Sequence, residues 1–297
     1  MLSLNRLDGN MELKDNCEEE IAKIEFIKYI ASGDFGDIFM GIYKDKYTAI
    51  KIIPYYEDEY IMEVLNYNEI IIGMETTKLF NRKITDNFIQ IYYWTKCRVS
   101  NLILEKIYQL TNNLMYKKQN NIYIIMELMM DNMDNYRFND LLEFKSIILQ
   151  LLYGLLCGIK YLSISIIDIS PRNILIKKVD YDKVYHIGYN KYLIPYYLPT
   201  VKFSDFGLSE IATDSSTDLF YLYVCILDIY NNNNIQSTMN NNDISQFEVL
   251  LNYLSNNRKY SHSDSSNILK IALNLPFFSI FNTSKIPSPS DVIHFYL

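Results

Sequence analysis

The spacing of hydrophobic residues changes near residue 130 of the chain. Between residues 24 and 53, three runs rich in β-branched and aromatic residues (IEFIKYI, DIFMGIY and YTAIKII) are separated by turn residues at Gly33, Gly36 and Lys44–Lys46. Runs of this kind are typical of strands, so this part predicts an antiparallel meander. The pattern further predicts a helix over residues 60–80 and strands near residues 88–96, 101–105 and 122–128.

Beyond the polar segment 130–139 the spacing becomes helical. Apolar residues recur at three- and four-residue steps from Phe144 to Leu162, which predicts one long amphipathic helix. A second helix is expected over residues 218–230, and short strands flank a tyrosine-rich insertion, YHIGYNKYLIPYYLPT. The polar runs NNNNIQSTMNNND and NYLSNNRKYSHSDSSN are expected to be loops.

The order of these elements predicts an α+β fold with two lobes. A polar tail at residues 1–20 precedes a small β-rich lobe at residues 21–128, and a mainly helical lobe follows at residues 129–297. The chain has 297 residues, of which 49% are hydrophobic and 21% charged, enough for a substantial core.

Charge and apolar runs limit the possible partners. The net charge of −7 does not indicate a nucleic-acid groove. The first twenty residues lack the apolar region of a signal peptide, and the runs Leu149–Leu162 and Leu219–Tyr230 are too short or too interrupted to span a bilayer. We therefore expect a soluble protein with neither nucleic acid nor membrane as partner.

The four cysteines carry a prediction about compartment. Cys17, Cys97, Cys157 and Cys225 show no metal-ligand spacing and no dense disulfide framework. Reduced thiols in a cytosol-like compartment are the expectation that follows.

A glycine hairpin opens the first stretch with recognisable chemistry. Residues 30–38 read IASGDFGDI, and Ala49-Ile-Lys51 follows. Backbone N–H groups at a glycine hairpin can approach phosphates closely. Ala49 and Lys51 lie on one face of a strand, because side chains alternate. A small residue and an ammonium beside such a hairpin suit a purine ring and its phosphates.

Two further motifs place acidic and amide groups after apolar elements. In SIIDISPRNIL, Asp168 and Asn173 lie five residues apart between an apolar helix and an apolar strand, and FSDFGLS supplies Asp205. A phosphotransferase needs a base and metal ligands of these types.

With these motifs in this order, residues 24–230 resemble the eukaryotic-type protein kinase superfamily. The chain is similar to divergent members, the haspin-like kinases and the Ser/Thr kinases of large DNA viruses. The resemblance implies a bilobal protein-kinase fold with a β-rich N-lobe and a mainly helical C-lobe. The terminal segment IPSPSDVIHFYL is faintly similar to the last helix of that fold.

The resemblance implies a site for ATP. Lys51 would hold the α- and β-phosphates, with Glu69 as its favoured partner and Glu63 and Glu75 as alternatives. Met126 would be the gatekeeper beside the adenine. The residues implied in ATP binding besides Lys51 are Ala31, Ser32, Gly33, Gly36, Ile38, Ala49, Met126, Glu127, Met129 and Leu175.

The resemblance also implies the residues of phosphoryl transfer. Asp168 would accept the proton of the substrate hydroxyl, and Asn173 and Asp205 would hold Mg²⁺. Ser170 replaces the lysine that Ser/Thr kinases carry two residues after the aspartate. Arg172 fits the D-x-x-x-R-N arrangement of many tyrosine kinases and is expected to do that lysine's work.

Further departures from the family pattern accompany these matches. Ile166 and Ile167 stand where the family has histidine and arginine, and only GLSEIATDSST separates Phe206 from Asp218, so the activation segment is shortened. Asp218 resembles the aspartate of the central helix that supports the catalytic loop.

The leading hypothesis is an ATP- and Mg²⁺-dependent protein kinase that acts on a protein substrate, with Ser/Thr acceptors favoured over Tyr. The alternatives are a pseudokinase scaffold that binds nucleotide or a partner without efficient turnover, and a kinase of small molecules. The composition is similar to that of large cytoplasmic DNA virus kinases, which implies a cytoplasmic location, in host cytoplasm or a virion.

Overall fold

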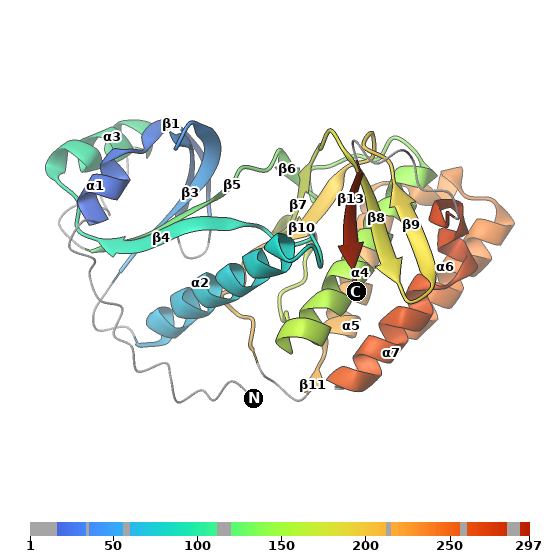
Figure 1. Cartoon of the computed structure of the whole chain (residues 1–297). Coiled ribbons are helices and arrows are strands. Elements are labelled where there is room, and N and C mark those ends of the chain that lie inside the picture. Colours follow the sequence, from blue (N-terminus) through green and yellow to red (C-terminus); the bar gives the residue numbers. More distant parts are fainter. Residues whose placement is uncertain are drawn as a thin grey trace. The chain divides into compact units, whose positions relative to one another are not determined.

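The computed structural model describes residues 17–33, 36–55, 60–111, 120–211, 215–255, 260–283 and 292–297. It has a mixed α+β architecture (Figure 1). The chain forms two compact units: residues 1–74 with 90–128, and residues 75–89 with 129–297. One boundary falls between Leu128 and Met129. Residues 75–89 join the second unit, which their place in the sequence did not suggest.

A five-stranded antiparallel sheet is the centre of the first unit. Its order is β1-β2-β3-β5-β4, so the meander expected from the sequence forms three of its five strands. Lys44 and Asp45, both with positive φ, make the two-residue turn between β2 and β3. The strands are β1 (Glu25–Ser32), β2 (Asp37–Tyr43), β3 (Lys46–Pro54), β4 (Ile91–Cys97) and β5 (Asn121–Glu127).

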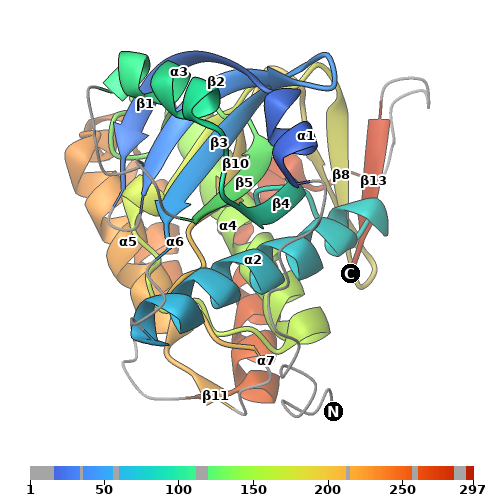
Figure 2. The same cartoon turned by 90° about the vertical axis from the view of Figure 1, so that its left-hand side faces the viewer.

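Two helices, α1 (Cys17–Ala22) and α3 (Asn101–Thr111), pack on this sheet (Figure 2). Ile103, Leu104 and Ile107 share one face of α3 and join the apolar core formed with α1 and the strands. The strand expected at residues 101–105 was therefore wrong, and residues 17–20 are helical rather than part of a polar tail. Helix α2 (Tyr60–Asn81), expected from the sequence, contributes residues to both units.

A disulfide joins Cys17 of α1 to Cys97 of β4, with their Cα atoms 5.7 Å apart. The expectation of four reduced thiols was wrong for this pair. The two cysteines are separated by 80 residues, so only the docking of α1 on the sheet brings them together. Cys157 and Cys225 are free and buried, and burial raises the pKa of both thiols.

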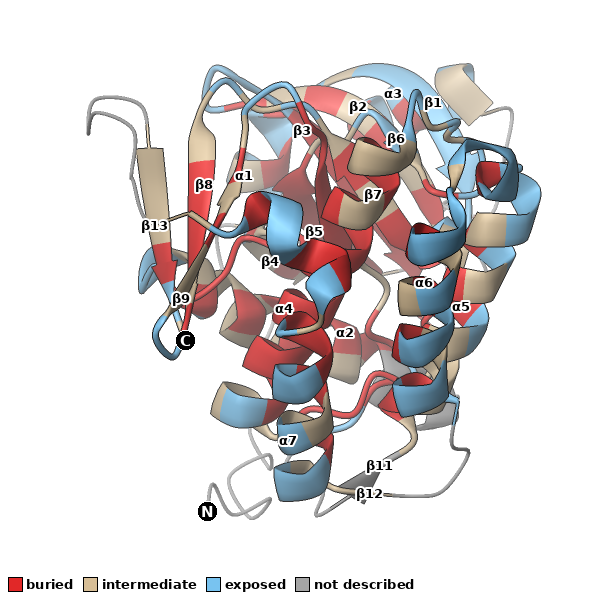
Figure 3. Ribbon diagram, turned by 90° about the vertical axis from the view of Figure 1, so that its right-hand side faces the viewer, coloured by how far each residue is buried: buried red, intermediate tan, exposed pale blue. Residues whose placement is uncertain are grey.

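Helix α4 (Leu141–Leu162) is the core helix of the second unit (Figure 3). Asp140 caps its N-terminus by accepting a hydrogen bond from Glu143 N, and Ser163 ends it in the left-handed region. Within the described residues, α4 is the one helix long and apolar enough to cross a membrane, but 89% of its most apolar window is buried inside the protein. Its hydrophobicity is accounted for by packing.

Helices and two small sheets surround α4. The strand orders are β10-β7-β6 and β13-β8-β9. The helices are α5 (Asp218–Asn232), α6 (Asn241–Leu254) and α7 (His262–Leu273), with 3₁₀ turns η3 (Pro171–Asn173), η4 (Ile235–Thr238) and η5 (Pro276–Phe281). The strands are β6 (Asp131–Asn132), β7 (Ile174–Lys177), β8 (Asp182–Ile187), β9 (Asn190–Ile194), β10 (Thr200–Phe203), β11 (Ser215–Ser216), β12 (Tyr260–Ser261) and β13 (Val292–Tyr296).

The polar runs of the C-terminal third fold differently from the expectation. Helix α6 begins in the last three residues of the first segment predicted to be a loop, and the second such segment contains the end of α6 and the first half of α7. Their polar residues are caps: Asn240 and Asp243 form a capping box on α6, and Ser261 accepts from Asp264 N on α7. The last segment is not a helix, since residues 292–296 pair in parallel with β8. Residues 284–291 lie outside the described residues.

Two histidines connect β13 to β8. His186 Nε2 lies 2.9 Å from His294 Nδ1, and the ring of His186 stacks on Tyr296. Burial, then His294 and Lys191, lower the pKa of His186 below its ordinary 6.5. The groups that face it are therefore His294 and Tyr296 on β13 and Lys191 on β9.

We predict that the disulfide stabilises the fold. Closing a loop across a separation of 80 residues is worth about 4 kcal/mol in the chain-entropy account. A reducing agent should lower the urea unfolding midpoint of the wild type, and the Cys17→Ser/Cys97→Ser variant should match the reduced protein and not respond to the agent. A wild-type unfolding midpoint that does not change on reduction would show that the disulfide does not contribute to stability.

We predict a pH-dependent stability centred on His186. Its pKa is lowered in the fold, so the neutral ring stabilises the fold above about pH 6.5 and this stabilisation is lost as the pH falls through the lower, folded-state value. Urea midpoints of the wild type should drop between pH 7 and pH 5 more than those of His186→Gln. Equal drops in both proteins would contradict this assignment.

Candidate functional site

The first unit contains a buried ion pair between β3 and α2. Lys51 Nζ lies 2.7 Å from both Oε1 and Oε2 of Glu69, and the two side chains are only 6% and 8% exposed. Of the other candidate partners, Glu75 pairs with Lys78 in the second unit, and the side chain of Glu63 lies outside the described residues. The pairing favoured from the sequence is the one that the structure contains.

The hairpin between β1 and β2 is closed at its glycines. Gly33 N donates to Gly36 O at 2.8 Å, and residues 34–35 between them lie outside the described residues. A Cβ atom at Gly36 would come within 2.2 Å of Ile52 O, so glycine is required there by the close approach of β3. Of the other hairpin candidates, Ala31 pairs with Ile38 across the strands, and Ser32 is exposed.

The remaining ATP candidates fall on several strands. In the first unit, Ala49 lies opposite Met126 in the β3–β5 pairing, and both are largely buried. Glu127 N donates to Gln90 O at 2.9 Å, so the carbonyl is the backbone group of Glu127 suited to the expected adenine contact. Met129 and Leu175, both half-buried, belong to the second unit.

A hydrogen-bonded pair lies in the loop after α4 in the second unit. Asn173 Nδ2 donates to Asp168 Oδ2 at 2.7 Å and to Asp168 O at 3.2 Å. The 3₁₀ turn η3 makes this possible, because Asn173 N bonds to Ser170 O and turns the amide back over the loop. Since the nitrogen of Asn173 is directed at Asp168, its Oδ1 is the atom with the chemistry of a metal ligand.

The pairing of β10 with β7 places the segment that contains Asp205 beside this loop. Phe203 lies opposite Ile174, and both N and Oγ of Ser204 donate to Asn173 O at 2.9 Å. Asp205 follows with φ of 59°, a left-handed conformation that is uncommon outside glycine and that aspartate tolerates. Non-glycine residues in this conformation concentrate at functional sites.

The oxygen groups of this loop suit magnesium. Mg²⁺ prefers carboxylate and amide oxygens and usually keeps several waters or phosphate oxygens as further ligands. Asn173 and Asp205 would supply one oxygen each. No group of three or more His, Cys, Asp or Glu that could hold a metal occurs among the residues that the structure describes.

Arg172 lies beside the candidate base. Its NH2 is 3.7 Å from Asp168 Oδ2, and its side chain is 63% exposed. An ion pair this long and this exposed contributes little to stability. The guanidinium can therefore be drawn toward a phosphate at small cost.

The loop is supported from beneath by α5. Ser165 Oγ donates to Asp218 Oδ1 at 3.0 Å, and Ser165 exchanges two backbone hydrogen bonds with Glu210. Ile166, where the resembled family has histidine, is buried. The sequence indicated Asp218 but not Ser165, for which no spacing gave a signal.

Comparisons with known proteins add no further assignment. No protein-family model matches the chain, and a search of curated proteins finds no match. The chemistry of the two sets of residues carries the functional interpretation.

We predict that Lys51 and Glu69 stabilise the first unit only as a pair. Lys51→Met leaves a buried carboxylate without its ammonium and should lower the free energy of unfolding by about 3 kcal/mol, whereas Lys51→Met/Glu69→Met should recover most of it. Glu75→Gln, which breaks the more exposed pair with Lys78, is the matched control and should cost under about 1 kcal/mol. A Lys51→Met effect no larger than the control would contradict this.

Proposed function

We propose that the chain is an ATP- and Mg²⁺-dependent protein kinase with a bilobal protein-kinase fold and a shortened activation segment. Ser/Thr hydroxyls are the favoured acceptors. The observation that carries the proposal is the loop in which Asn173 donates to Asp168, together with the end of β10 beside it, two residues before Asp205. The buried Lys51–Glu69 pair supports it independently.

The proposed reaction uses Asp168 as the base. Its contacts with Asn173 and Arg172 both involve Oδ2, so Oδ1 is the oxygen that would accept the proton of the substrate hydroxyl. The hydroxyl oxygen bonds to the γ-phosphorus, and the bond from that phosphorus to the bridging oxygen of ADP breaks. Bound magnesium, held by Asn173 and Asp205, would supply charge neutralisation on the phosphates.

Two cationic side chains complete the proposal. Lys51, oriented by Glu69, would bind the α- and β-phosphates. Arg172 would neutralise the transferring phosphoryl group in place of the lysine that Ser170 replaces, since its exposed guanidinium is only weakly held.

The disulfide bears on the proposed location. Of host cytoplasm and virion, the two locations expected from the sequence, the Cys17–Cys97 bond favours the virion, because disulfides persist in oxidising surroundings and are rare in the cytosol. The proposed partner in either place is a protein substrate.

We predict that Asp168→Asn abolishes phosphoryl transfer from γ-labelled ATP to protein. Loss of the base should lower kcat by at least about a hundredfold, and Arg172→Ala should lower it by about a hundredfold through lost charge neutralisation. Asp180→Asn, an exposed carboxylate in the same unit, is the matched control and should label protein as the wild type does.

Other outcomes would favour the other hypotheses. Binding of ATP with no label in any protein would indicate a pseudokinase scaffold. The motivating features are Ile166 and Ile167 in place of histidine and arginine, Ala31 in place of the first glycine, the absent catalytic-loop lysine and the shortened activation segment. Label in small metabolites with protein substrates untouched would indicate a small-molecule kinase.

A further inference from the structure

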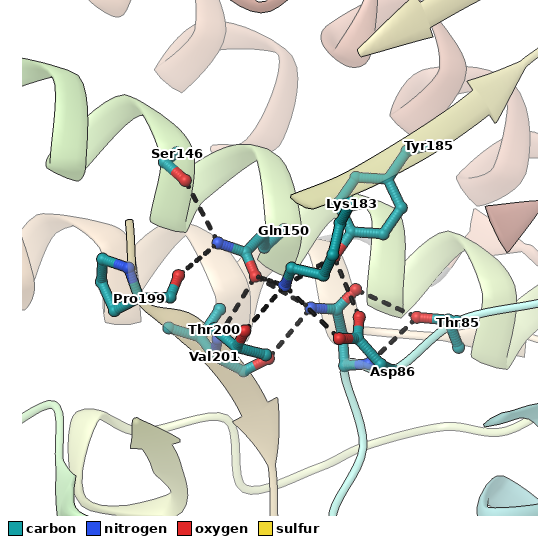
Figure 4. A network of polar contacts seen from close by, with 10 residues as sticks. Thr85, Asp86, Ser146, Gln150, Lys183, Tyr185, Pro199, Thr200 and Val201 are labelled. Carbon is teal, nitrogen blue, oxygen red and sulfur yellow. Dashed lines mark hydrogen bonds and ion pairs between the residues drawn. The ribbon is translucent and has the colours of Figure 1, made fainter. Parts of the chain in front are cut away.

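A buried lysine lies at the centre of a polar network in the second unit (Figure 4). Lys183 of β8 is 1% exposed, and its Nζ donates to Gln150 Oε1 at 2.8 Å and to Thr200 Oγ1 at 2.9 Å. It also lies 3.4 Å from Asp86 Oδ2, whose side chain is equally buried. Tyr185 OH closes the cluster by donating to Asp86 Oδ1 at 3.0 Å.

Burial of this ion pair is costly. Each buried charge loses several kcal/mol of hydration, and apolar residues of similar size often stabilise a fold as well or better. Stability alone therefore does not explain why this ion pair is buried. Its hydrogen bonds are directional, so each of them fixes the position of one partner atom.

Side chains of the network form hydrogen bonds with the backbone at the beginning of β10. Gln150 Nε2 donates to Pro199 O at 2.8 Å, and Val201 N donates to Gln150 Oε1 at 3.3 Å. Asn87 Nδ2 donates to Val201 O at 2.9 Å. Side chains of α4, of β8 and of the segment after α2 thus converge on three consecutive residues, Pro199 to Val201 (Figure 4).

The other end of β10 leads to a proposed metal ligand. Phe203 N donates to Asn87 O at 2.8 Å and Ile89 N donates to Phe203 O at 2.9 Å, so the segment 87–89 lines one edge of β10 while β7 pairs with the other. The strand has only four residues. A shift of the β10 register by one residue would move Asp205 along the strand and turn its side chain to the opposite face.

We infer that the Lys183–Asp86 ion pair and its polar network are the positioning device for Asp205, which they fix through the register of β10. The inference rests on the proposed function, in which Asp205 holds the magnesium that accompanies ATP. Lys183 touches neither substrate nor cofactor in this role. It acts on the metal ligand through Thr200, Gln150 and the strand.

The test measures metal binding and strand protection, neither of which requires turnover. Mn²⁺, as a paramagnetic substitute for Mg²⁺, is titrated into the full chain with a non-hydrolysable ATP analogue. Lys183→Met/Asp86→Asn removes both charges together, and Thr200→Val removes one hydroxyl contact. Lys145→Met, which breaks the Lys145–Asp243 pair elsewhere in the same unit, is the matched control.

The double variant should weaken Mn²⁺ binding by about tenfold, a loss typical of residues that orient a metal ligand. Amide hydrogen exchange at Val201 and Phe203 should accelerate in parallel, and Thr200→Val should change both readouts in the same direction by a smaller factor. Lys145→Met should change neither.

The outcomes separate this inference from the proposed function. Faster exchange with unchanged Mn²⁺ affinity in the folded variants would overturn the inference, as would no change in either readout. If the double variant does not fold, Thr200→Val decides by the same criteria. Absence of Mn²⁺ binding in the wild type would overturn the inference along with the metal site, whereas binding without phosphoryl transfer would defeat only the proposed kinase activity.

Discussion

The arrangement of the proposed metal ligands depends on the pairing of two four-residue strands. Because β7 and β10 are antiparallel, the beginning of β7 lies opposite the end of β10, with Ile174 facing Phe203. Asn173 directly precedes Ile174, and Asp205 lies two residues beyond Phe203, after Ser204, which donates two hydrogen bonds to the carbonyl of Asn173. In the sequence, the β8–β9 hairpin separates β7 from β10. A connection of this length adds little to the cost of pairing the two strands, because the entropy cost of closing a loop grows slowly with its length.

Local patterns in the sequence predicted the parts of the fold that are set locally. The meander of the first unit and the long helix α4 follow from the periodicity of their own apolar residues. Helix α6 was missed because its asparagine-rich start resembles a loop, although Asn240 and Asp243 are capping residues. Strand β13 and the Cys17–Cys97 bond could not be predicted, because their partners are distant in the sequence and are brought near only by tertiary packing.

The same distinction applies to the candidate site. Asp168 and Asn173 are five residues apart in one short loop, so their closeness in space could be predicted from the sequence. The partner of Asp218 is Ser165, far from it in the sequence, and no spacing rule joins them. Lys183 is a stronger case, since a lysine just before the tyrosine-rich insertion is expected at the surface, yet it is almost wholly buried.

Among the described residues, each unit contains an almost wholly buried lysine–carboxylate pair, Lys51–Glu69 in the first and Lys183–Asp86 in the second. Apolar side chains would fill the same space at lower cost, but they would leave the neighbouring strands able to shift, because dispersion forces have no direction. Phosphoryl transfer loses rate steeply when groups move by an ångström. If the proposed chemistry is the function, both units need groups in fixed positions, and this need accounts for the cost of burying charge. In the first unit the fixed group is an ammonium, and in the second it is a strand that precedes a proposed metal ligand.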